Sequence, residues 1–170
     1  MKTPICSICL GSDILCQACH KKMEEGLVSE SEINVARALH SLSKEARVLE
    51  NVTIHHVVET DKIVLIICGR GDTSNIVGKG GVIAKKLSKQ LGKHIKIVEK
   101  TSDLKNFLQQ LLYPTRVIGV NVIYASGSEA LKVVIEGNKI PMDLKTFKDI
   151  VRTIFGKEII IGHHEKNSRH

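Results

Sequence analysis

The sequence predicts a mixed α/β (α+β) protein in which a short Cys-rich segment precedes two related units. Residues 1–27 hold four of the five cysteines and show no long hydrophobic periodicity, whereas residues 29–161 alternate between helical and strand-like patterns. One order of elements recurs in that longer part with an offset of 64 residues, which aligns Gly92 with Gly156. The expected domains are 1–27, 28–100 and 101–164, followed by a flexible tail at 165–170.

The Cys-rich segment contains two C-x-x-C pairs with six residues between them, and the four cysteines are Cys6, Cys9, Cys16 and Cys19. In a reducing compartment such pairs are more often metal ligands than disulfides. Four thiolates complete the tetrahedral shell of a structural zinc ion, and so small a segment needs such an ion to fold. A redox-active pair and a four-cysteine iron–sulfur site remain as alternatives.

An amphipathic helix is predicted to follow, because apolar residues recur at three- or four-residue steps from Ser29 or Ser31 to about Glu50. Either serine can cap this helix at its N-terminus.

Two strands are then predicted at 52–58 and 62–68, joined by a short turn. The first contains His55 and His56, for which the sequence offers no evident carboxylate partner. The second, KIVLIIC, is apolar on both faces, so we expect it at the centre of a sheet with Cys68 as a small buried hydrophobe.

A helix over 82–91 is predicted after a glycine-rich stretch, with Gly92 at its C-terminus and a strand at 94–98. The second unit repeats this plan, with helices expected at 104–112 and 144–155 and strands at 116–124, 130–136 and 158–161. The residues after Ile161 are polar and unpatterned, and we expect them to be frayed.

The segment Gly78-Lys79-Gly80-Gly81 precedes the predicted helix at 82–91. Thirteen glycines would produce about one G-x-x-G pattern by chance, so the pattern alone does not indicate a function. The residues around it do. Glycines allow a nucleic-acid backbone to come close, and free amides at the N-terminus of the next helix would face the phosphates. An ordinary glycine turn is the alternative, whereas neither Rossmann nor Walker spacing is present.

The stretch NIVGKGGVIAKKLSKQLGKHIKIVE resembles the signature of the KH family, in the prokaryotic (type II) order of elements. The resemblance implies that the loop clamps about four nucleotides of single-stranded RNA and that an apolar groove beside it receives the bases. The implied RNA-binding residues are Ile76, Val77, Gly78, Lys79, Gly80, Gly81, Val82, Lys85, Lys86 and Lys89.

The second unit is expected to be a degenerate KH unit, because the offset places Met142-Asp143-Leu144-Lys145 where the glycine loop would be. Its Lys139, Lys145, Lys148 and Arg152 either contact RNA or are solvated helix charges. Two consecutive KH units resemble the archaeal NusA family of transcription factors, which implies a role in transcription elongation or termination or in RNA handling. The Cys-rich segment and the missing second loop depart from that pattern.

Composition agrees with a nucleic-acid partner, since the formal charge is +7 and the pI is near 9.2. We therefore expect a non-catalytic, cytoplasmic single-stranded RNA-binding protein with no membrane partner and no small-molecule substrate. No constellation for catalysis stands out in the sequence. One alternative is an adaptor that docks on RNA polymerase or the ribosome through the zinc segment and the second unit. A weaker alternative is a nucleotide-binding enzyme.

Overall fold

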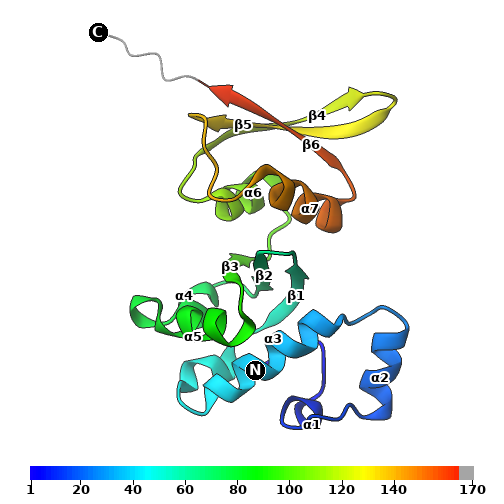
Figure 1. Ribbon diagram of the computed structural model, residues 1–170, viewed down its shortest axis with the longest axis vertical. Coiled ribbons are helices and arrows are strands. Elements are labelled where there is room, and N and C mark those ends of the chain that lie inside the picture. Colours follow the sequence, from blue (N-terminus) through cyan, green and yellow to red (C-terminus); the bar gives the residue numbers. More distant parts are fainter. Residues whose placement is uncertain (165–170) are drawn as a thin grey trace. The chain divides into compact units, whose positions relative to one another are not determined.

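The computed structural model describes residues 1–164 (Figure 1), so the tail predicted at 165–170 lies outside the described residues. The chain divides into two compact units, Met1–Lys100 and Thr101–His170. Each unit contains one three-stranded sheet, so the fold is mixed α+β as predicted. None of the helices within the described residues combines the length and the apolarity that a bilayer crossing requires.

The Cys-rich segment forms two short helices, α1 (Ser7–Leu10) and α2 (Gln17–Glu24), each of which begins directly after a cysteine. Hydrophobic periodicity could not predict them, because they are too short to show it. The segment belongs to the first unit and packs on α3 (Glu30–Ser43), whose Ile33 and Ala36 contact the buried residues Ile5, Cys9, Leu10, Cys19 and Val28.

Helix α3 begins at a capping box formed by Ser29 and Glu32. The Ser29 side chain accepts a hydrogen bond from the Glu32 backbone N–H, and the Glu32 side chain accepts one from the Ser29 backbone N–H. The prediction that this helix runs to about Glu50 is wrong, since it ends at Ser43 and a separate 3-10 helix, η1, covers Arg47–Asn51. The three-residue spacing of apolar residues there suits both helix types.

The first sheet has the order β1-β2-β3, with β1 (Ile54–Glu59) antiparallel and β3 (His94–Glu99) parallel to β2 (Ile63–Cys68). All six residues of β2 are buried, which confirms its predicted central place and the burial of Cys68. The connection from β2 to β3 passes through α4 (Thr73–Val77), the 3-10 turn η2 (Lys79–Gly81) and α5 (Val82–Leu91). Apolar residues of α3 and α5 share one core with β2.

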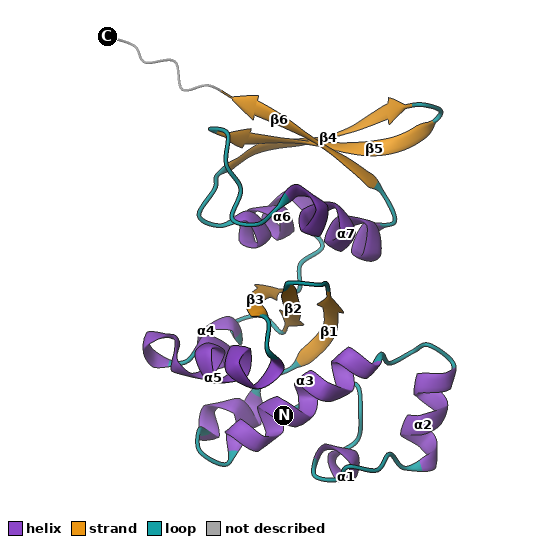
Figure 2. Ribbon diagram, in the orientation of Figure 1, coloured by secondary structure: helices purple, strands orange, loops and turns teal. Residues whose placement is uncertain are grey.

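The second unit contains α6 (Leu104–Leu112), β4 (Val117–Ala125), β5 (Ser128–Glu136), α7 (Leu144–Phe155) and β6 (Glu158–His164). Its sheet has the order β4-β5-β6, again antiparallel and then parallel. Figure 2 shows both helices on one face of this sheet. The expectation of frayed residues after Ile161 is wrong up to His164, because the backbone pairing with β5 continues whatever the side chains are.

The two units differ most in the connection between the second strand and the last helix. Gly92 and Gly156 both end a helix in the left-handed conformation, with φ of 68° and 63°. In the first unit, Ile63 pairs with His94, 31 positions later, whereas in the second Ala130 pairs with Glu158, 28 positions later. The second unit has no helix between β5 and α7 within the described residues, so it has no counterpart of α4 and η2.

Candidate metal centre and glycine loop

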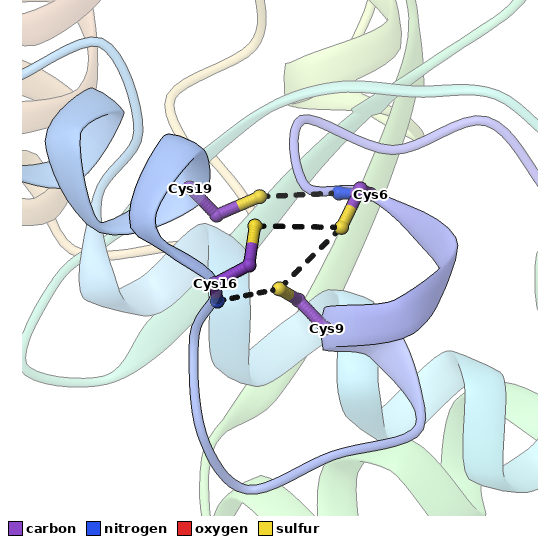
Figure 3. A group of neighbouring side chains, drawn as sticks. All are labelled: Cys6, Cys9, Cys16 and Cys19. Atoms are coloured by element: carbon purple, nitrogen blue, oxygen red, sulfur yellow. Dashed lines mark hydrogen bonds between the residues drawn. The ribbon is translucent and has the colours of Figure 1, made fainter.

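The four cysteines of the N-terminal segment converge on one point (Figure 3). Their Sγ atoms all lie within 4.8 Å of one another, with 3.4 Å between Cys6 and Cys9 and 3.9 Å between Cys6 and Cys16. A tetrahedral zinc ion with bonds of about 2.3 Å would place its sulfur ligands about 3.8 Å apart. None of the five cysteines forms a disulfide in the described structure. The cluster could therefore hold a metal ion.

Each C-x-x-C pair donates a backbone hydrogen bond to the other pair. The N–H of Cys6 lies 3.4 Å from Cys19 Sγ, and the N–H of Cys16 lies 3.1 Å from Cys9 Sγ. Such donors stabilise thiolates, as metal binding requires. They also hold the two halves of the segment together around the cluster.

The thiols of the cluster compete for negative charge. The backbone N–H of Cys9 helps to lower the pKa of Cys6 to about 6, and the backbone N–H of Cys19 lowers the pKa of Cys16. The Cys16 N–H acts in the same direction on Cys9, but burial and the neighbouring thiols raise the pKa of Cys9 to about 12. A bound cation would remove this competition, because all four thiolates would share its charge.

Helix α3 supports the cluster from outside the Cys-rich segment. Arg37 Nε donates a hydrogen bond of 3.1 Å to the backbone carbonyl of Cys9. The same guanidinium buries Nη2 without a hydrogen-bond partner in the described residues. Sequence reasoning missed Arg37, since it lies 28 positions from Cys9 and no spacing rule links the two.

The glycine loop joins α4 to α5 through backbone conformations that favour glycine. Gly78 has φ 74° and ψ 165°, a region almost restricted to glycine, and a Cβ there would lie 2.7 Å from Ile83 Cγ1. Gly80 and Gly81 are left-handed, with φ of 64° and 76°. A Cβ at Gly80 would meet no atom within 4 Å, so Gly80 faces open space.

The N-terminus of α5 has no side-chain cap. Gly81 occupies the capping position, and the first turn contains no acidic residue. The corresponding end of α7 is closed, because the Asp143 carboxylate accepts a 2.9 Å hydrogen bond from the Thr146 backbone N–H. A helix N-terminus attracts anions when its amides are free. Of these two N-termini, only that of α5 is free to bind an anion.

The predicted site residues around this loop differ in what they can contact. Lys79, Lys85 and Lys89 are exposed and form no ion pair within residues 1–164. Lys86 forms an ion pair with Glu45 and lowers the pKa of that carboxyl. The charge of Lys86 is therefore already partly neutralised.

The three predicted apolar residues form a gradient of exposure. Val82 is 53% exposed and Val77 is half-buried. Ile76 is fully buried in the core of the first unit, so it anchors the loop and offers no surface to a ligand.

The expectation that His55 and His56 lack a carboxylate partner is wrong for His56. Its Nδ1 lies 3.2 Å from Glu32 Oε1, which comes from α3. The same carboxylate oxygen accepts a hydrogen bond from the Val57 backbone N–H. The Glu32 carboxylate thus joins α3 to β1, and we assign it a structural role.

No family model and no curated protein matches the chain. A solved structure described as "Crystal structure of APE1850" is similar to it, with a TM-score of 0.54 and 21% sequence identity over 75% of this chain and 96% of that one. At this identity the similarity shows the fold alone. The chain is therefore a mixed α+β protein with a four-cysteine cluster that could hold a metal ion.

Proposed function

We propose that the chain is a non-catalytic single-stranded RNA-binding protein whose first unit carries a type II KH domain at residues 28–100. The observation that carries this proposal is the uncapped N-terminus of α5 behind the Gly78–Gly81 loop, with Lys79 exposed in that loop. Phosphate groups are the ligands that free helix amides and unpaired lysines attract together.

The order of elements supports the KH assignment. Helix α3 and strands β1 and β2 precede α4, the glycine loop, α5 and β3, which is the order that the type II KH resemblance implies. The second unit repeats this order without α4 and the loop, as a degenerate KH domain would. Tandem units of this kind support a NusA-like role in transcription elongation or termination, or in RNA handling.

The residues around the loop could contact both the phosphate and the base of a nucleotide. Lys79, Lys85 and Lys89 would neutralise the backbone phosphates, and each such contact makes affinity fall with added salt. Val82 and Val77 would offer apolar surface to the bases, in place of the aromatic rings that the chain largely lacks.

We further propose that the four-cysteine cluster holds a structural zinc ion. Its sulfur spacing is close to that of a tetrahedral shell, and four protein ligands leave no open position for catalysis. When bound, the ion would supply the stability that burial alone cannot give to so short a segment.

The test of RNA binding combines Lys79→Asp with Gly80→Asp in the full chain. Gly80 suits this purpose because a side chain there meets open space, whereas one at Gly78 would collide with Ile83. Ser102→Asp with Lys105→Asp, both exposed in the second unit, changes the net charge by the same amount and is the matched control. Binding of a pool of short single-stranded RNAs is measured at low and at physiological salt, after circular dichroism has confirmed folding.

We expect the loop variant to lose at least about tenfold in affinity and the control to stay within about twofold. Wild-type affinity should also fall as salt rises. Equal affinities of the loop variant and the wild type would contradict the proposal.

A further inference from the structure

The second unit has an apolar groove beside its edge strand. A cavity of about 460 Å³ lies among β6, α7 and the connection that precedes α7. The apolar part of its lining is formed by Ile135, Ile140, Leu144, Ile159, Ile160 and Ile161. Leu144 and Ile160 are 46% and 44% exposed, so the apolar surface is open to a ligand.

Strand β6 offers backbone groups beside this groove. Among the described strands it pairs only with β5, so its other edge is unpaired. An unpaired edge is a template for an extended peptide, which adds as a further strand while its alternate side chains enter neighbouring pockets.

The rim of the groove carries a free positive charge. Lys148 lines the groove and also a neighbouring hollow that contains Lys145 and Arg152. Lys145 and Arg152 lie 3.5 and 3.8 Å from Asp149, so their charges are partly neutralised. Lys148 forms no ion pair in the part of the chain that the structure describes. The groove therefore favours a ligand that is apolar and carries an acidic group.

A nucleic acid is the less suitable anion at this place. The Asp143 carboxylate caps α7, where it accepts hydrogen bonds of 2.9 Å from both the backbone N–H and the hydroxyl of Thr146. It occupies the helix end that would otherwise attract a phosphate, and its negative charge repels one. A peptide can compensate for this repulsion, because its backbone can pair with the open edge of β6 while an acidic side chain reaches Lys148; a nucleic-acid backbone cannot form such a strand ladder.

We propose that this groove binds an extended segment of a partner protein that adds as a strand to β6 and presents both apolar and acidic side chains to the sheet face that α7 covers. The proposal goes beyond RNA binding by the first unit and does not depend on it. It assigns the second unit a ligand of its own.

The proposal is tested by selecting from a pool of phage-displayed nonapeptides on the full chain. The same selection is repeated on two single variants, Lys148→Glu and Leu144→Asp, each of which places a negative charge at the groove. Lys105→Glu, an exposed position on α6 outside the groove, is the matched control. We expect apolar-acidic peptides to be enriched on the wild type and on the control and to be lost on both groove variants.

The best peptide is then measured by fluorescence anisotropy and by amide chemical shifts. We expect at least about tenfold weaker binding to Lys148→Glu, binding to the control within about twofold, and shifts concentrated in β6. A lack of enrichment, or equal affinity for all variants, would overturn the proposal. So would displacement of the peptide by oligouridylate that itself shifts the β6 amides, since the groove would then be a nucleic-acid site. Failure of RNA binding at the glycine loop leaves all these outcomes unchanged.

Discussion

Glu32 is a buried carboxylate that four groups of three residues approach within hydrogen-bonding distance. Ser29 approaches it through its backbone N–H and its hydroxyl, Val57 through its backbone N–H and His56 through Nδ1. Removing this acceptor leaves the buried backbone N–H of Val57 without a partner, which is costly.

We predict that Glu32→Ala lowers the free energy of unfolding by about 1–3 kcal/mol. Glu30→Ala is the control, because Glu30 is exposed in the same first turn of α3 and contributes only its interaction with the helix dipole. Urea denaturation of both variants measures the difference. Similar losses in the two would mean that the link between α3 and β1 contributes little.

The glycines of the loop should respond unequally to a methyl group. Gly78→Ala introduces both a contact of 2.7 Å with Ile83 and a backbone conformation that alanine avoids, so we expect a loss of about 2–3 kcal/mol. Gly80→Ala meets only the left-handed backbone penalty, and we expect about 1–2 kcal/mol. Thermal or urea unfolding ranks the two, and the reverse order would contradict the described loop geometry.

Residues that act through local spacing could be predicted from the sequence. The four clustered cysteines and the capping serine are of this kind, although only the structure shows that Ser29 rather than Ser31 is the cap. Arg37 and the pair of Glu32 with His56 could not be predicted, because their contacts join positions 24 to 28 residues apart.

At the scale of the element, the Cys-rich segment and β2 should differ in thiol reactivity. We predict that the metal-loaded chain shows no rapidly reacting thiol, that a chelator exposes four, and that a denaturant exposes the fifth. Burial raises the pKa of Cys68, and this thiol lies in the central strand of the first sheet. Titration with a chromogenic disulfide reagent counts the thiols at each step.

The number of thiols that react after chelation shows whether the metal stabilises only the Cys-rich segment or also strand β2. Five rapidly reacting thiols after chelation would mean that β2 opens when the metal leaves. Rapid reaction of all four cluster thiols before chelation would contradict metal binding itself.

Elements with long periodicity were predicted well. The helices at 104–112 and 144–155 have the predicted bounds, because each has a strongly apolar face and an aspartate cap. Helices α1 and α2 were missed, since they are positioned by the cysteine cluster rather than by an apolar face of their own. The predicted helix to about Glu50 merged α3 with η1, because their apolar residues share one spacing.

For the whole molecule, the division into two units limits how far metal loss should spread. Every candidate ligand and every described contact of the cluster lies within Met1–Lys100. We predict that chelation speeds amide hydrogen exchange in α1, α2 and α3 and leaves β5 and α7 unchanged. Exchange monitored by mass spectrometry tests this, with the metal-loaded chain as reference. Faster exchange throughout Thr101–His170 would show that the units unfold together.

The repeated plan of the two units was visible in the sequence, and both sheets have the same strand order and pairing sense. The groove of the second unit was not visible, because it depends on a shortened connection and on residues brought together from β5, β6 and α7. A cavity has no sequence pattern of its own.

The alignment of Gly92 with Gly156 also sets Lys79 against Asp143, so the two units carry opposite charges at aligned sequence positions, in the loop before α5 in the first unit and at the cap of α7 in the second. Two copies with identical loops would compete for one strand of nucleic acid or bind it jointly with increased avidity. With the charge reversed, an anion that binds at the first unit as proposed would be repelled at the second. If each unit binds the ligand proposed for it, one polypeptide would hold two independent sites, and a substitution that changes the affinity of one unit would not alter the ligand choice of the other.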